Sequence, residues 1–229
     1  MNIEAEYILC LETSASNCSV ALTHPKGDLV LAGSTDNNHA EALMPMIEQI
    51  LLQAEINIKA IQAIAISAGP GSYTGLRIGA STAKGLCFGL NVPLIAINTL
   101  EALAHAAIES TDGTYDMYWP MIDARRMEVY TALYDAALKE IQPAHALILE
   151  PNSFDAVLQK QIVLYCGDGA MKFKSLCTHP NAQFLDITAT AKNQIHLALQ
   201  KFRNNDFADL AYQDPLYVKE FYTPVSPSY

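Results

Sequence analysis

The sequence has little charge, and what it has is mostly of one sign. Charged residues make up 17% of its 229 residues, and 24 acids against 14 bases give a formal net charge of -10. No run of Lys or Arg offsets the acids locally. Because an acidic surface repels phosphate backbones, direct nucleic-acid binding by this chain alone is disfavoured. The hydrophobic share of 51% instead predicts a folded protein with a real core and some apolar surface meant for a partner.

Membrane and export signals are missing as well. The longest apolar stretch, residues 85–97, is interrupted by Asn91 and Pro93 and is too short to cross a bilayer. Glu4 and Glu6 stand where a signal peptide would carry positive charge. The five cysteines include no CxxC pair, which indicates reduced thiols. We therefore expect a cytoplasmic protein without a membrane segment, with free thiols at Cys10, Cys18, Cys87, Cys166 and Cys177.

Sequence signatures of metal or nucleophilic catalysis are also missing. No histidine has a second one three to five residues away, so a helical two-histidine metal site is not expected. No GxSxG segment marks a serine nucleophile. We predict no catalytic residue and no metal ligand, and we interpret the histidines as surface or cap residues: His24, His39, His105, His145, His179 and His196.

What the chain does have is a repeated order of elements. Apolar runs and turn residues predict strands at 7–11, 18–22, 29–32, 61–66 and 93–97, with helices at 40–54, 76–90 and from 100. The second half repeats this order: strands at 117–122, 128–134, 146–149 and 162–166, a helix at 152–160, a glycine turn at 167–169 and a last helix at 191–202. Such duplication predicts an α/β protein of two lobes, each a mixed sheet with helices on its faces. This is the architecture of the actin-like ATPase (ASKHA, ribonuclease H-like) superfamily.

The lobes are expected to meet at a polar segment with a central glycine, residues 108–116. We predict an N-terminal lobe over 1–110 and a C-terminal lobe over 111–202. The remaining segment, about 203–229, is expected to pack back on the N-terminal lobe.

Two strand ends carry the residues of a candidate vestigial nucleotide site. In this superfamily the tip of the first strand usually holds an Asp and small polar residues at phosphate and metal. The longer side chain of Glu12 would spoil close coordination. The alternative, a strand-end cap and a surface ion-pair group, is equally compatible with the sequence. The candidate residues are Glu12, Thr13, Ser14, Asp123, Gly167, Asp168 and Gly169.

The loop Gly69 to Gly75 matches neither standard nucleotide motif. No Lys-Ser or Lys-Thr follows its last glycine, and its spacing is GxGxxxG rather than GxGxxG. It could hold an anion at the start of the following helix or simply make a tight turn into a closely packed helix.

The helix after this loop carries small residues every four positions, at Gly75, Gly79 and Ala83. Such a stripe allows another helix to approach closely, either from within the same domain or from a second subunit. The second reading predicts an interface on this helix and on residues 40–54. Its candidate residues are His39, Leu43, Met46, Ile47, Ile50, Tyr73, Leu76, Gly79, Ala80, Ala83 and Cys87.

Three segments, residues 8–22, 65–104 and 121–134, resemble the TsaB family, also called YeaZ, and the similarity extends over essentially the whole chain. The resemblance implies the actin-like fold and a non-catalytic scaffold or activator role in forming threonylcarbamoyladenosine at position 37 of tRNA. The implied partners are the catalytic paralogue TsaD and the ATPase TsaE, with homodimers when the chain is alone and tRNA contacted only through the complex. The implied contact surface is the pair of N-terminal-lobe helices. TsaD carries the HxxxH metal site, and this chain lacks that pair.

Two other functions stay open at this point. One is an active ATPase or phosphotransferase of the same fold; the other, disfavoured by the histidine spacing, is a glycoprotease-like metallopeptidase. No firmly bound cofactor is expected, and ATP or ADP at the complex interface is left open. The chain also departs from the family's C-terminal Pro-x-Tyr-Leu-Arg pattern, since Lys219 stands where the family has arginine. Lysine keeps the positive charge but lacks the planar guanidinium group that makes bidentate contacts.

Overall fold

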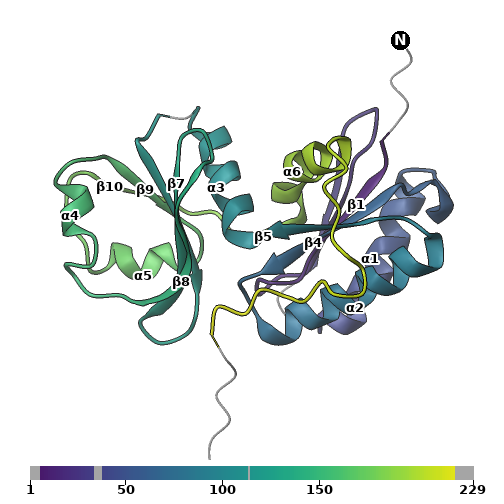
Figure 1. Ribbon diagram of the computed structural model, residues 1–229, viewed down its shortest axis with the longest axis horizontal. Helices are drawn as coiled ribbons and strands as arrows, with labels where there is room; N and C mark the ends of the chain where they lie inside the picture. Colours follow the sequence, from purple (N-terminus) through teal and green to yellow (C-terminus); the bar gives the residue numbers. More distant parts are fainter. Residues whose placement is uncertain (1–5, 34–37, 113, 220–229) are drawn as a thin grey trace, which may run out of the picture.

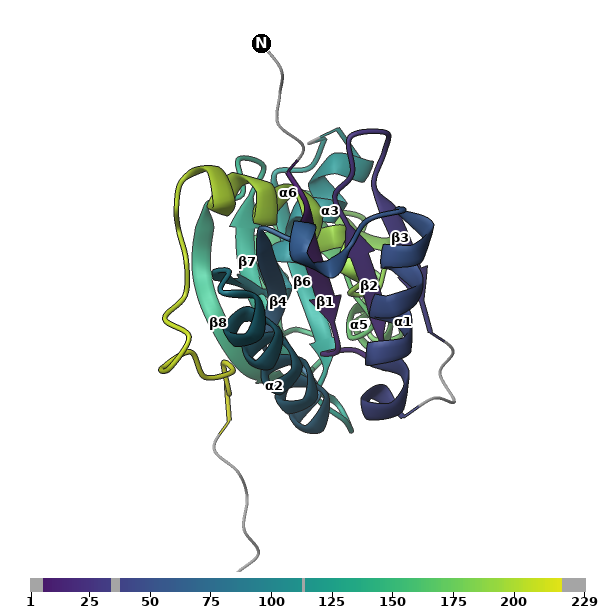
Figure 2. The ribbon, with the colours of Figure 1, turned by 90° about the vertical axis from the view of Figure 1, so that its right-hand side faces the viewer.

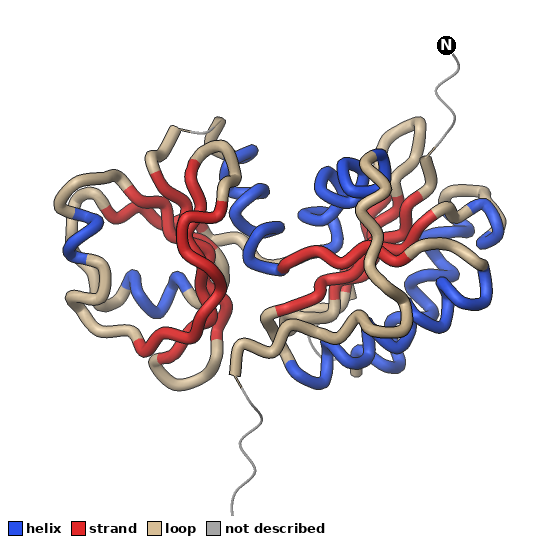
Figure 3. Tube along the Cα trace, viewed as in Figure 1, coloured by secondary structure: helices blue, strands red, loops and turns tan. Residues whose placement is uncertain are grey.

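The computed structural model describes residues 6–33, 38–112 and 114–219, which form two lobes side by side, each built on one five-stranded sheet (Figures 1 and 3). The predicted tail beyond Lys219 and one predicted helix cap, Asn37, lie outside the described residues. Within the described ranges, no helix is long and apolar enough to cross a membrane.

The first lobe contains a mixed sheet in the order β3-β2-β1-β4-β5. Its first three strands are antiparallel neighbours, and β4 and β5 run parallel to β1. Two helices cover one face of the sheet, as Figure 2 shows from the helical side. The elements are β1 (Ile8–Glu12), β2 (Ser19–Leu22), β3 (Leu29–Ala32), α1 (His39–Gln53), the 3-10 turn η1 (Ile58–Ala60), β4 (Ala63–Gly69), α2 (Tyr73–Leu90) and β5 (Leu94–Asn98).

The second lobe repeats this topology, with β6 in the place of β1 and the order β10-β9-β6-β7-β8. Its elements are β6 (Met117–Asp123), β7 (Glu128–Asp135), β8 (Glu140–Ile148), α4 (Asp155–Leu158), β9 (Val163–Cys166), α5 (Ala170–Lys174) and β10 (Ala182–Leu185). The same strand order in two sheets confirms the predicted duplicated, two-lobed actin-like fold.

The two longest remaining helices pack on the sheet of the other half of the chain. Helix α3 (Thr99–Ser110) precedes the predicted division at residue 110, yet Leu103 and Ala107 pack against Tyr118 in the second sheet. Helix α6 (Ala191–Arg203) belongs to the second half of the sequence, yet Ile195 packs with Ile8 in the first sheet. Therefore the division at 110 separates the sheets but not the helices that cover them.

Strand β1 shows why its sequence is apolar without interruption. Leu9 and Leu11 face the core under α1 and α2, whereas Ile8 and Cys10 face α6 on the opposite side. Because successive side chains of a strand point to opposite faces, a strand covered on both sides needs apolar residues at every position.

The structure differs from the prediction in one missing strand, one longer strand and one helix cap, besides smaller shifts at other element ends. Strand β10 has no counterpart in the prediction, since its short segment is only half-buried and has no continuous apolar run. Strand β8 begins at Glu140 rather than at residue 146; it lies at the sheet edge, where Pro143 removes no ladder bond that the sheet needs. Helix α3 is capped by Asn98, whose side chain accepts from the amides of Leu100 and Glu101, rather than by Thr99.

After α6 the chain returns along the first lobe toward the second (Figure 1). The Ala208 amide donates to the Leu94 carbonyl at 2.8 Å, and the Leu216 amide donates to the Ala68 carbonyl at 2.6 Å. At its described end, Lys219 forms an ion pair with Glu128 on β7 at 2.5 Å. This C-terminal strap, residues 204–219, thus contacts both lobes.

Candidate functional site

The first strand tip holds its acid inside the lobe. Glu12 is fully buried, and its Oε1 accepts the Ser14 amide at 2.6 Å. Its Oε2 accepts the Ser67 hydroxyl from β4 and the Gln194 side-chain amide from α6, the latter at 3.2 Å. Hydrogen bonds from three directions compensate the burial of this carboxylate. These bonds direct both carboxylate oxygens into the lobe.

Gly71 of the loop and Gly75 and Gly79 of α2 allow close packing on this tip. A Cβ added at Gly75 would overlap the Thr13 carbonyl oxygen, and one added at Gly79 would overlap the Thr13 hydroxyl. A Cβ on Gly71 would lie 2.6 Å from the Ser14 Cβ. The loop is therefore a tight turn into a closely packed helix, and the helix that it brings close belongs to the same lobe.

The second strand tip is more open and carries an ion pair. Asp123 pairs with Lys172 of α5 at 2.5 Å and accepts the Arg125 amide at 2.5 Å. Its own amide donates to the Asp168 carboxylate at 2.9 Å. Partial removal from water raises the pKa of Asp168, and the nearby Asp123 charge adds to this effect.

The glycine turn beside Asp168 fits against β6. Gly167 has a φ of +96°, and a side chain there would overlap the Met121 carbonyl oxygen. The Gly169 amide donates to that same carbonyl at 3.1 Å. These contacts place Gly167, Asp168 and Gly169 at the second tip and give both glycines a packing role.

Residues of both tips meet at a very small cavity. Its volume is about 10 Å³, and it is lined by Ser14, Ala15, Leu103, Ile122, Asp168 and Ala189. Ligand pockets usually measure about 300–1,000 Å³. The cavity as it stands has room for about one water molecule.

Most of the predicted interface residues lie in the core of their own lobe, which corrects their assignment as surface contacts. The predicted stripe faces inward because α1 and α2 use their most apolar sides to cover the sheet. His39 and Tyr73 remain accessible; the His39 ring donates from Nε2 to the Ala15 carbonyl at 3.0 Å. The nine buried positions are Leu43, Met46, Ile47, Ile50, Leu76, Gly79, Ala80, Ala83 and Cys87.

The outer faces of α1 and α2 nevertheless carry exposed apolar and small residues. Leu52 on α1 is 79% exposed, and Phe88 on α2 is 83% exposed. Between the turns of α2, Gly85 and Gly89 face open space, where an added Cβ would meet nothing within 4 Å. Helices α1 and α2 lie side by side on the outside of the first lobe (Figure 2). We call this surface the outer helix face.

The C-terminal strap packs against the start of α2, through Tyr217. The Arg77 guanidinium lies 4.4 Å from the centre of the Tyr73 ring, and its Nε donates to the Tyr217 hydroxyl at 3.3 Å. The Tyr73 and Tyr217 rings are 5.0 Å apart. Residues far apart in the sequence thus form one cluster at the start of α2.

Sequence reasoning missed several residues that the fold brings to these places. Gln194 and Lys172 support the two tips, and Tyr217 docks the strap. The sequence predicts separate surface positions for His105 and His196, but their rings stack with centres 4.5 Å apart. No spacing pattern could reveal these pairs, because each joins segments that meet only through the tertiary fold.

Two lobes of the same topology, with paired strand tips, define a protein of the actin-like ATPase fold class. The family model for TsaD, tRNA N6-adenosine threonylcarbamoyltransferase, matches residues 23–219. The chain belongs to this family and, within it, to the TsaB (YeaZ) group.

Individual relatives point the same way. The tRNA threonylcarbamoyladenosine biosynthesis protein TsaB of Haemophilus influenzae is 38% identical over 123 residues, 54% of this chain and 51% of that protein. The protein of the same name from Escherichia coli is 27% identical over 226 residues, 93% of this chain and 94% of that protein. The solved structure of YeaZ from Pseudomonas aeruginosa is 28% identical with a TM-score of 0.76, covering 93% of this chain and 99% of that one.

Proposed function

We propose that this chain is a non-catalytic scaffold subunit in the formation of threonylcarbamoyladenosine at position 37 of tRNA. The observation that carries the proposal is the first strand tip. Where the fold usually presents an acid to phosphate and metal, the Glu12 carboxylate is fully buried and hydrogen-bonded to Ser14, Ser67 and Gln194. A carboxylate held in this way stabilises the lobe and is not placed to take part in a reaction. The curated relatives are named for biosynthesis of this modified nucleoside.

The partners of this proposal are the catalytic paralogue TsaD and the ATPase TsaE, with a homodimer when the chain is alone. The outer helix face is the surface proposed for TsaD, because its exposed Phe88 and Leu52 are unusual for a surface left in water. The small residues Gly85 and Gly89 on the same face would let a partner helix approach closely. With a net charge of -10, tRNA is expected to contact the complex through its other subunits. The proposed location is the cytoplasm.

The decisive experiment combines binding and activity. Replacing Phe88 by Asp should weaken association with purified TsaD at least about tenfold, as expected for an anchoring aromatic residue. It should equally reduce tRNA modification in a mixture of this chain, TsaD, TsaE and tRNA. The matched control is Ile148→Asp, which changes a 65% exposed residue on β8 of the other lobe. Full association and activity of the Phe88 variant would reject the outer helix face as the interface.

A titration separates this scaffold from an active ATPase of the same fold. Isolated chain mixed with ATP and Mg²⁺ should show neither turnover nor binding heat, whereas the assembled complex is where a nucleotide is expected. Turnover by the isolated chain that is lost in Asp123→Asn would reject the scaffold proposal in favour of a phosphotransferase.

A further inference from the structure

Two helices that pack on different sheets bring three potential metal ligands together. His105 and Glu109 lie one turn apart on α3, and the Glu109 Oε2 is 3.5 Å from the His105 Nδ1. His196 comes from α6, and its ring stacks on that of His105 with centres 4.5 Å apart and planes inclined by 28°. One ligand atom from each side chain lies within 4.8 Å of the other two.

The chemistry of this set suits a borderline-soft divalent ion. Two imidazoles and one carboxylate form a common three-ligand set for Zn²⁺, which leaves a fourth position for water or substrate. The side chain of Glu109 is 61% exposed and that of His105 only 13%. The set therefore combines one fixed ligand with a carboxylate that is free to adjust.

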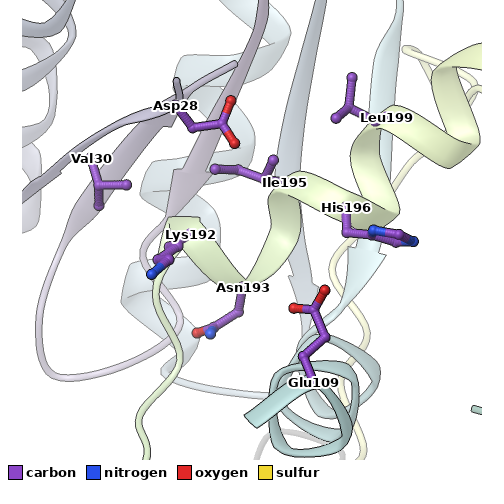
Figure 4. A pocket seen from close by; sticks show the side chains of 8 residues that line it. All are labelled: Asp28, Val30, Glu109, Lys192, Asn193, Ile195, His196 and Leu199. Atoms are coloured by element: carbon purple, nitrogen blue, oxygen red, sulfur yellow. The ribbon is translucent and has the colours of Figure 1, made fainter. Parts of the chain in front are cut away.

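A pocket of about 510 Å³ opens beside two of these side chains, those of Glu109 and His196. Figure 4 shows the Glu109 carboxylate of α3 directed toward His196 and Asn193 on α6. One base, Lys192, and one further acid, Asp28, also line the pocket, together with Val30, Ile195 and Leu199. An ion held by the three ligands would keep an open side toward this space.

We propose that His105, Glu109 and His196 bind a divalent transition-metal ion. The chemistry of the three ligands favours Zn²⁺. Metal–ligand bonds of about 2.0–2.2 Å place the donor atoms of a tetrahedral ion about 3.3 Å apart, so the three side chains must close by rotation. His196 and Glu109, both exposed, have room for that movement.

Binding of an ion at this site should also affect the structure of the protein. Helix α3 packs on the second sheet and α6 on the first, so the metal joins helices anchored in different lobes. Binding to the folded state alone stabilises that state by mass action. The ion is therefore expected to stiffen the connection between the lobes.

Calorimetric titration of the full chain with ZnCl₂ tests the proposal, after removal of any purification tag and in the Cys177→Ser background. This background removes the one cysteine that is not fully buried. We expect one site per chain and a rise in the melting temperature with Zn²⁺. His196→Ala, His105→Ala and Glu109→Gln should each weaken binding at least about tenfold. His145→Ala, which changes a histidine on β8, should bind as the parent does.

Cobalt provides a second readout that does not depend on stability. Co²⁺ in the site should show the intense visible bands of a four-coordinate ion, and these bands should be absent in His196→Ala, an exposed position expected to tolerate the change. Equal Zn²⁺ affinity in the parent and in all three ligand variants would overturn the proposal. So would a thiolate-to-cobalt charge-transfer band, or no binding at millimolar Zn²⁺.

Discussion

The Gln194 side-chain amide donates to the buried Glu12 carboxylate at 3.2 Å and to the Ser67 hydroxyl at 3.0 Å. These residues come from α6, β1 and β4, so one hydrogen-bond network joins α6 to β1. Helix α6 thereby completes the first lobe, although it belongs to the second half of the sequence.

Removing this amide should destabilise the whole lobe. Gln194→Leu keeps the volume but leaves the Glu12 carboxylate with one donor fewer, at an expected cost of about 2–3 kcal/mol in the free energy of unfolding. Urea denaturation at pH 7 measures this change in the free energy of unfolding. Gln200→Leu, at an exposed position of the same helix, should change stability by less than about 0.5 kcal/mol. Equal effects of the two changes would show that the network contributes nothing.

Two glycines of α2 should respond in opposite directions to alanine. Gly75→Ala would force a Cβ onto the Thr13 carbonyl oxygen and should cost about 2–3 kcal/mol or prevent folding. Gly85→Ala meets open space on the same helix and should stabilise by up to about 1 kcal/mol through helix propensity. Thermal unfolding compares them, and a stabilising Gly75→Ala would contradict the packing described at the first tip.

The thiols should differ sharply in reactivity. Burial raises the pKa of Cys18 to about 11 and those of Cys87 and Cys166 to about 12, and it raises the pKa of Cys10 as well. Because the thiolate is the reactive form, these four should resist alkylation at pH 8 in the native state. Iodoacetamide labelling followed by mass spectrometry should find modification at Cys177, which is partly exposed. Rapid native labelling of Cys10 or Cys166 would contradict this core.

The raised pKa of Asp168 predicts that the stability of the protein depends on pH. The pKa of this carboxyl is raised in the folded state, so the stabilisation from its protonated form is complete below the ordinary value of about 3.9. That stabilisation is lost as pH rises through the folded pKa. Asp168→Asn keeps an acceptor for the Asp123 amide without the charge. It should therefore gain stability relative to the parent as pH rises from about 3 to 7.

Denaturation midpoints across this pH range provide the measurement for Asp168→Asn. A difference between Asp168→Asn and the parent that stays constant across this range would show that the Asp168 carboxyl titrates alike in the folded and unfolded chains.

The sequence by itself determined the fold class and the positions of most elements. Buried strands such as β1 and β4 appear as unbroken apolar runs because both of their faces are covered, and the repeated order of elements predicts the duplication. The glycine turns and the acidic strand ends are local features too, so the order of residues alone places Glu12, Asp123 and Gly167 to Gly169 at strand tips. Strand β10 cannot be predicted from the sequence, because this short, half-buried segment shows little hydrophobic periodicity.

Only the tertiary structure decided which way each of these residues faces. The stripe of Gly75, Gly79 and Ala83 fits a partner helix or the molecule's own strand tip equally well, because helical spacing records which residues share a face and not what covers that face. The fold turned this stripe inward onto Thr13 and left Phe88, Gly85 and Gly89 outside. It likewise brought His105 beside His196 by packing α3 and α6 together across the lobes, and a contact between segments so distant in the chain has no local signature.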